Sequence, residues 1–300
     1  MKRQKPKYLN PSVSGGKSLL IEKECLTKPL ISGQLGILEF GKQLVESGDL
    51  DPVYLILWRA KFNPIKLRRW LLAFFCFYHC GTCSWIVDQP NYWAAMTEAA
   101  NTSKHPRGTE RRHYRGEAAR KSMEYLRSRG VDGLFRGLEG ELELAEAMSY
   151  VTEWVGFGKW IAFKVADMLE RLEICRINFS ATDTFLFESP REGAELVAEN
   201  YGDRIAKEDA PRWALAYLGK RLGKLLAPPR YERTLNGQEY ETILCKWKSH
   251  LNNHYPVGHD LEELRLGLMR YTGSRTAQTL LRELRCLEPK EKPTTLIVGS

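Results

Sequence analysis

Two glycines and a lysine lie close together in the segment Val155-Gly156-Phe157-Gly158-Lys159-Trp160. Glycines one residue apart permit a tight turn with positive φ and let the backbone approach a ligand closely. A helix is predicted to follow, and its first N–H groups have no partner within the helix. Such N–H groups bind phosphate, and Lys159 adds a charged contact. Gly156, Gly158, Lys159 and Trp160 are therefore candidate DNA- or phosphate-binding residues; the alternative is a turn that only joins two packed helices.

The densest positive stretch is residues 107–116, which contains four arginines and one histidine. Planar guanidinium groups can donate two hydrogen bonds at once to a phosphate. Arg111 and Arg115 would share a face if the segment is helical. Arg107, Arg111, Arg112 and Arg115 thus predict a clamp on the DNA backbone or a pocket for a phosphorylated substituent, with a solvated basic loop as the alternative.

A third basic group is Lys246 and Lys248, which flank Trp247 on a predicted helix. An aromatic residue among basic ones can stack on a flipped base or pack in a core. We interpret Trp247 as a core residue and keep the two lysines as candidate DNA contacts.

Two other motifs are set aside. Cys76, Cys80 and Cys83 have the spacing of an iron–sulfur triad, but they follow an apolar helix in a helical chain, so we expect packed thiols. A zinc site that includes His79 is the alternative. The segment 14–18 resembles part of a P-loop, yet Pro11 stands where the first glycine belongs and no strand precedes it.

The elements that must position these residues are predicted to be helices, which makes the fold class all-α. The predicted helices cover 22–50 (one or two helices), 52–62, 65–78, 91–100, 117–129, 141–173 (broken at Gly156 and Gly158), 194–226, 240–251 and 261–271. Residues 1–20 are predicted to be a flexible basic arm, and 286–300 a tail. The helical domain between them, 21–285, could consist of two lobes, with the hairpin and a catalytic loop at 141–190.

Composition narrows the class of partner. The 300-residue chain has a net charge of +8, which favours a polyanionic partner, nucleic acid before an anionic membrane. No apolar run reaches the roughly 18 residues that a membrane-spanning helix needs. The seven cysteines fit reduced thiols, so we expect a cytoplasmic protein.

The turn and the loop after the next helix together resemble the helix-hairpin-helix DNA glycosylase superfamily. Its hairpin reads glycine, apolar, glycine, basic, then a helix with an early alanine, as Gly156 to Ala162 do here. Its catalytic aspartate lies in a following loop, where this chain has Ala181-Thr182-Asp183-Thr184. The resemblance implies a glycosylase-like all-α fold with Asp183 as the catalytic residue. Read without the resemblance, Asp183 is a helix N-cap.

Two departures narrow this resemblance. Trp160 stands where bifunctional glycosylases carry a lysine nucleophile, so a Schiff-base lyase is not expected. Cys245 and Cys286 stand far apart, unlike the four-cysteine iron–sulfur loop of endonuclease-III-like relatives.

Over residues 50–270 the layout resembles a phage branch of that superfamily, the amino acid:DNA transferases, once named α-glutamyl/putrescinyl-thymine pyrophosphorylases. The arginine segment, the hairpin with its aspartate loop, and Cys245-Lys246-Trp247-Lys248 carry the resemblance. In that branch an amine displaces the pyrophosphate of 5-(pyrophosphomethyl)uracil in DNA. The resemblance therefore implies double-stranded DNA with a modified pyrimidine, a small amine or amino acid such as glycine, a flipped base, no metal or organic cofactor, and action in the host cytoplasm if the protein is from a phage.

Under this hypothesis Arg111, Arg112 and Arg115 stabilise the leaving pyrophosphate. Asp183 either deprotonates the amine or stabilises a cationic, methide-like intermediate. Two alternatives remain open: a monofunctional DNA glycosylase, in which Asp183 stabilises an oxocarbenium-like sugar, and a non-catalytic DNA-binding module. The product distinguishes them, because a glycosylase leaves an abasic site and a transferase leaves a substituted base.

Overall fold

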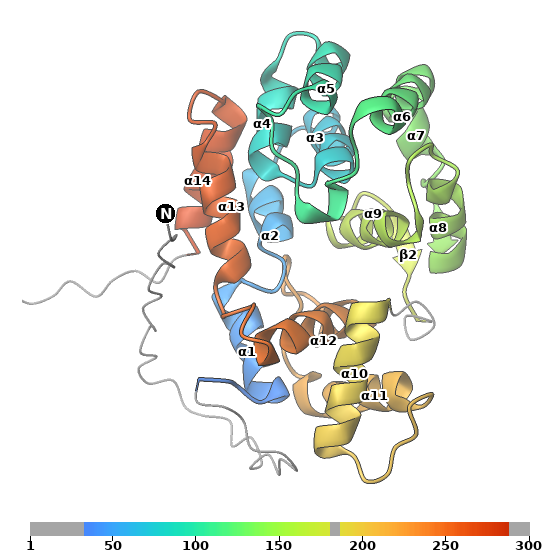
Figure 1. Ribbon diagram of the computed structural model, residues 1–300, viewed down its shortest axis with the longest axis vertical. Helices are drawn as coiled ribbons and strands as arrows, with labels where there is room; N and C mark the ends of the chain where they lie inside the picture. The colour runs from blue at the N-terminus through green and yellow to red at the C-terminus, as the bar shows by residue number, and fades with distance from the viewer. Residues whose placement is uncertain (1–32, 181–186, 288–300) are drawn as a thin grey trace, which may run out of the picture.

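The computed structural model describes residues 33–180 and 187–287, and these form a predominantly helical protein (Figure 1). The predicted all-α class is confirmed. Two short strands, β1 (Glu141–Glu143) and β2 (Arg176–Asn178), pair in parallel with Glu141 opposite Arg176. No helix in the described part of the chain is long and apolar enough to cross a membrane.

The larger of two apolar cores surrounds helix α3 (Pro64–Phe77). Pro64 fits the first turn, where its missing N–H costs nothing, and the Asn63 side chain accepts a hydrogen bond from the Lys66 N–H. Every residue from Trp70 to Phe77 is buried, so the second half of α3 has no solvent-facing side. The helices around it are α2 (Pro52–Ala60), α4 (Cys80–Asp88), α5 (Tyr92–Asn101), α6 (Gly116–Arg129), α7 (Val131–Arg136), α8 (Leu144–Thr152), α9 (Lys159–Arg171), α13 (His259–Met269) and α14 (Arg275–Arg285). We call this group the large lobe.

A second core gathers around Trp247, which is fully buried and donates from Nε1 to the Leu35 carbonyl. The interpretation of Trp247 as a core residue is confirmed. The helices of this small lobe are α1 (Ile37–Ser47), α10 (Glu188–Tyr201), α11 (Ala210–Leu222) and α12 (Gly237–Leu251). Within the described residues, the chain runs from α1 in this lobe through the large lobe, returns for α10 to α12, and continues into α13 and α14 on the large lobe (Figure 1).

Several predicted elements differ from the observed ones. Helix α4 forms in a region where no helix was predicted; the His79 side chain caps its first turn by accepting from the Thr82 N–H. Helices α7 and α14 were not predicted either, and the predicted helix 194–226 is split into α10 and α11. The arm and almost all of the tail lie outside the described residues, and the division of 21–285 into domains stays a prediction.

Between the two cores lies a set of buried charges that we call the interlobe charge layer. On α9 these are Lys164, Asp167 and Arg171; opposite them are Asp51 and, on α12, Gln238, Glu239 and Glu241. Arg171 Nη1 lies 2.5 Å from Asp51 and Nε lies 3.4 Å from Glu239. Lys164 lies 3.6 Å from Glu241, and Gln238 donates to Asp167 at 3.0 Å. Each charge meets a partner from another element, so the layer joins the lobes by specific pairs rather than by apolar packing.

Candidate active site

The predicted hairpin is formed by α8, a short turn and α9. Gly156 has φ +86°, a conformation that favours glycine, and Gly158 is the N-cap of α9. No side chain caps this helix start, and Gly158 and Lys159 are exposed. The first N–H groups of α9 are thus open to an anion. Trp160 is half-buried, with its ring 5.3 Å from the ring of Tyr78 at the end of α3.

Arg111 fastens this hairpin to the large lobe. Its Nε donates to the Cys76 carbonyl at 3.2 Å and its Nη1 to the Gly156 carbonyl at 3.1 Å. The guanidinium lies between the rings of Tyr114 and Phe157, and burial lowers its pKa. The arginine segment and the hairpin, predicted separately, are therefore brought together, but Arg111 itself does so from a buried position.

The other arginines divide into two kinds. Arg107 Nη2 donates to the carbonyls of Ala99 and Ala100 and so supplies hydrogen-bond donors to the last turn of α5. Arg112 and Arg115 are exposed beside the hairpin-bound Arg111, at the short helix η1 (Thr109–Arg111) and the start of α6. Arg112 and Arg115 are thus the arginines of this segment that remain accessible to a phosphate.

The two lysines of α12 do not join this surface. The Lys246 ammonium is buried, donates to the carbonyls of Asp49 and Leu50 at 2.6 Å, and lies 2.8 Å from Asp260. Lys248 forms an ion pair with Glu192 on α10. Lys246 has no free donor direction for a phosphate, so we leave it out of the surface considered for DNA.

Asp183 lies outside the described residues. The described chain stops at Ser180 and resumes at Phe187, whose ring packs edge-on against Phe163 of α9 at 5.6 Å. The catalytic assignment of Asp183 therefore stays a prediction.

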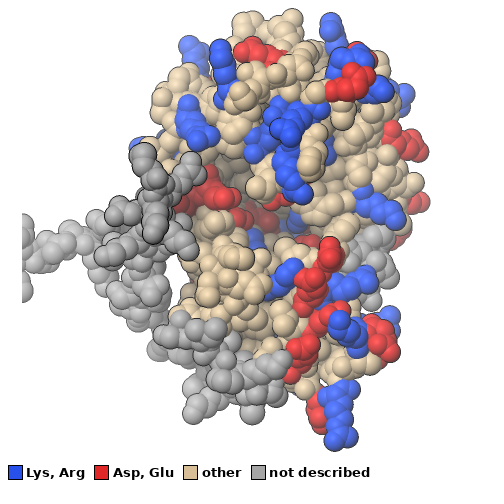
Figure 2. All heavy atoms as spheres, viewed as in Figure 1, with Lys and Arg blue, Asp and Glu red and all other residues tan. Residues whose placement is uncertain are grey.

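A pocket of about 420 Å³ lies at the edge of the large lobe, next to the interlobe charge layer. We call it the boundary pocket. Its apolar wall includes Tyr54 and Phe74, and its charged or polar lining includes Asp51, Tyr78, His79, Arg107, Glu110, Asp260, Glu263 and Arg270. Figure 2 shows acidic side chains at the hollow in the middle of this face and basic ones above it.

The loop that closes one side of the boundary pocket depends on a close backbone approach. The Gly108 N–H donates to the Phe77 carbonyl at 2.9 Å. A Cβ at Gly108 would stand 2.4 Å from the Tyr78 carbonyl oxygen, so only glycine lets the loop lie this close. This contact holds Glu110 at the pocket and places the end of α3 beside it.

Two neighbouring groups reach the pocket with unused hydrogen-bonding capacity. Burial raises the pKa of Tyr78, and no described group hydrogen-bonds to its hydroxyl. Burial, followed by the nearby Arg270 charge, lowers the pKa of His79 to about 4, so the ring is neutral at pH 7. His79 Nδ1 accepts from the Thr82 N–H at 3.1 Å, which puts the ring proton on Nε2.

Sequence reasoning missed the boundary pocket. Its lining comes from the start of α2, the end of α3, residues 107–110 and α13, which are distant in the chain. The available signal was the polar pair Tyr78-His79 at the end of an apolar helix, of which we considered only His79, as a zinc ligand.

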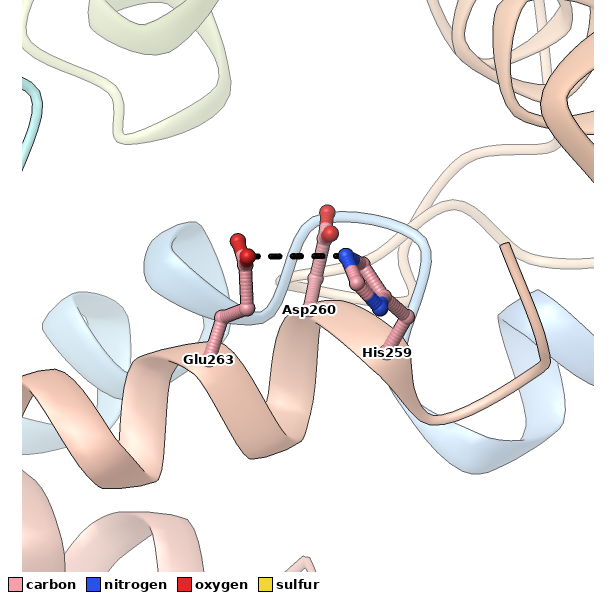
Figure 3. Close-up of side chains that lie close together, drawn as sticks. All are labelled: His259, Asp260 and Glu263. Atoms are coloured by element: carbon pink, nitrogen blue, oxygen red, sulfur yellow. Dashed lines mark ion pairs between the residues drawn. The ribbon is translucent and has the colours of Figure 1, made fainter. Parts of the chain in front are cut away.

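Two side-chain clusters of a kind that can bind metals are already engaged within the protein. On the first turns of α13, His259, Asp260 and Glu263 point toward one another (Figure 3). However, Asp260 already binds the Lys246 ammonium, and Glu263 lies 3.5 Å from His259 Nε2. Cys76, Cys80 and Cys83 are buried in the large-lobe core, and burial raises the pKa of all three thiols, Cys76 to about 11. This confirms the expectation of packed thiols.

A larger groove of about 1140 Å³ runs along the two strands. Its lining includes the glutamates Glu139, Glu141, Glu143, Glu146, Glu170 and Glu173. A groove with this charge repels a DNA backbone, so we place the candidate site at the boundary pocket and the hairpin instead.

Comparison with known proteins gives a consistent result. Residues 41–255 match the family described as amino acid:DNA transferase. The chain is 36% identical over 276 residues to a glycinyltransferase of Pseudomonas phage PaMx11, which covers 82% of this chain and 94% of that protein. It is also 27% identical over 248 residues to a putrescinyltransferase of Delftia phage PhiW-14, covering 78% of each chain.

Proposed function

Because the chain belongs to the amino acid:DNA transferase family, we propose that it joins an amino acid to a thymine-derived base in DNA by displacing pyrophosphate from 5-(pyrophosphomethyl)uracil. Glycine is the first donor to test, since the glycinyltransferase shares more identity with this chain than the putrescinyltransferase does. The family match supports the reaction class, and the finer identity of base and donor is our proposal.

The observation that carries the proposal is the contact between Arg111 and the Gly156 carbonyl. It joins the arginine segment to the hairpin, so that the open start of α9, Lys159, Arg112 and Arg115 can follow one stretch of DNA backbone. The boundary pocket is reached from the same region, because Trp160 of the hairpin packs on Tyr78 of the pocket wall. A base flipped from the duplex would enter there.

The bond changes follow from the substrate. The donor nitrogen forms a bond to the methylene carbon, the bond from that carbon to the pyrophosphate oxygen breaks, and pyrophosphate leaves with both electrons. The nitrogen gives up one proton, which we assign to Asp183 as general base. If the carbon–oxygen bond breaks first, Asp183 instead stabilises the cationic, methide-like intermediate. Exposed arginines at the hairpin stabilise the charge on the leaving group.

Nucleoside mass spectrometry tests the proposal. DNA with 5-(pyrophosphomethyl)uracil is incubated with the full chain and a mixture of glycine, glutamate and putrescine, then digested. A nucleoside in which one amine replaces the pyrophosphate is the expected product. Abasic sites would instead identify a glycosylase, and unchanged DNA with salt-sensitive binding would identify a binding module.

The Asp183→Asn variant separates the catalytic from the capping interpretation. Loss of transfer with DNA binding unchanged is expected for a catalytic aspartate, because asparagine caps a helix nearly as well but does not act as a base. Full activity of the variant would remove Asp183 from the mechanism.

A further inference from the structure

Glu110 and Arg270 line the boundary pocket with opposite charges, and neither forms an ion pair with a described residue. Glu110 lines the pocket from the loop, and Arg270 lines it from the end of α13. On the same helix, Arg265 lies 2.6 Å from Glu262, and Asp260 lies 2.8 Å from Lys246. Since Glu110 and Arg270 do not pair with each other either, the cavity keeps an open positive and an open negative position.

Each open charge has a neutral hydrogen-bonding group near it. Arg270 is close enough to His79 to help lower its pKa, and the neutral His79 ring carries its proton on Nε2. Glu110 lines the pocket with Tyr78, whose pKa is raised by burial and is also affected by Lys164 and then by Glu110; the Tyr78 hydroxyl has no hydrogen-bond partner in the described part of the chain and can accept or donate. The lining thus offers donors for an anion at Arg270 and His79, and acceptors for a cation at Glu110 and Tyr78.

Building on the proposed function, we propose that the boundary pocket binds the donor as a zwitterionic α-amino acid. Arg270 and His79 Nε2–H bind its carboxylate, and Glu110 with the Tyr78 hydroxyl binds its ammonium group. The pocket volume of about 420 Å³ lies within the range of small-molecule sites. A diamine has no carboxylate for Arg270 and His79 to bind, so it would lose these contacts.

Equilibrium binding in the absence of DNA tests the proposal on the full chain. Glycine, glycinamide and putrescine are titrated by ligand-observed NMR; glycinamide keeps the amine but has no carboxylate. The variants are Arg270→Gln and Glu110→Gln. Their matched controls are Arg265→Gln and Glu262→Gln on α13, which pair with each other and do not line the pocket. Circular dichroism checks that every variant is folded.

We expect the wild type to bind glycine about tenfold more tightly than glycinamide, the effect of one charge-assisted contact. Arg270→Gln should bring this ratio close to one, whereas Glu110→Gln should weaken both ligands alike and keep the ratio. The controls should behave as the wild type. A wild type that binds glycinamide or putrescine as well as glycine, or an Arg270→Gln variant that keeps the preference, overturns the proposal.

The product assay distinguishes a wrong assignment of the donor site from a wrong proposed function. If the wild type transfers glycine to DNA and both pocket variants keep its KM for glycine, only the donor site is wrong. If the wild type transfers no amine, the proposed function fails even where glycine binds. KM is informative here because a merely structural role would lower stability and leave the glycine preference unchanged.

Discussion

The interlobe charge layer and the boundary pocket are built from the same residue types but differ in how those residues are satisfied. They even share Asp51, which pairs with Arg171 in the layer and also lines the pocket. In the layer Lys164, Asp167 and Arg171 all have partners. In the pocket Glu110 and Arg270 form no ion pair with a described residue. Paired charges join elements, whereas unpaired ones at a cavity remain available to a ligand.

The largest effect is expected in the layer. Arg171→Met should lower the free energy of unfolding by about 3–5 kcal/mol, because it leaves Asp51 without its cation and the Pro228 carbonyl without its donor. Urea unfolding at pH 7.5 measures the change. As a control, Arg176→Gln removes an ion pair with Glu141 in which both side chains are exposed, and it should cost less than about 1 kcal/mol. Equal losses of stability in Arg171→Met and Arg176→Gln would contradict the expected difference between buried and exposed ion pairs.

The next effect is a pH dependence at the pocket. The folded-state pKa of His79 is about 4, below the ordinary value of 6.5, so folding favours the neutral ring. The resulting stability is present above about pH 6.5 and is lost as the pH falls toward 4, by about 3 kcal/mol at most. His79→Gln should remove this part of the pH dependence. Urea unfolding between pH 4 and 7.5 measures it, with His113→Gln, at an exposed site, as the control. If the free energy of unfolding changes equally with pH in His79→Gln and the wild type, His79 is protonated as readily in the folded state as in the unfolded chain.

Two tyrosines allow a direct comparison between the regions. The Tyr54 hydroxyl donates to the buried Asp167 carboxylate at 2.6 Å, whereas the Tyr78 hydroxyl has no described partner. Tyr54→Phe should therefore destabilise by about 2 kcal/mol and Tyr78→Phe by less than about 0.5 kcal/mol. Thermal and urea unfolding of both variants measure this. A Tyr78→Phe cost as large as that of Tyr54→Phe would mean that the Tyr78 hydroxyl is structurally engaged.

The smallest effect has the opposite sign. Burial raises the pKa of Glu110, so its ionised form destabilises the protein at neutral pH, although the side chain remains open to the pocket. Glu110→Gln should stabilise the protein by less than about 1 kcal/mol at pH 7.5. The gain should vanish near pH 4, where the wild-type carboxyl is protonated and its folded state no longer carries the charge. Destabilisation at pH 7.5 would show that the carboxylate is needed for folding.

Much of the candidate DNA surface follows from local sequence. Gly156 and Gly158 predict the turn because the backbone geometry they permit is a property of the residues themselves. The apolar spacing around Pro64 predicts α2 and α3, since helix periodicity and the restriction at proline are also local. Arg111 shows what local sequence does not predict. Its sequence context matches that of Arg112, yet one guanidinium is buried against Gly156 and the other is exposed.

The sequence by itself thus determined the helical class, the hairpin and the family resemblance, because these depend on neighbouring residues and on motifs read in order. Only the tertiary structure decided which charges are used up inside the protein. Lys246 is buried against Asp49 and Asp260, whereas Glu110 and Arg270 meet at one cavity from segments about 160 residues apart. Burial and ion pairing depend on what other segments bring to the same place, and no local pattern encodes that.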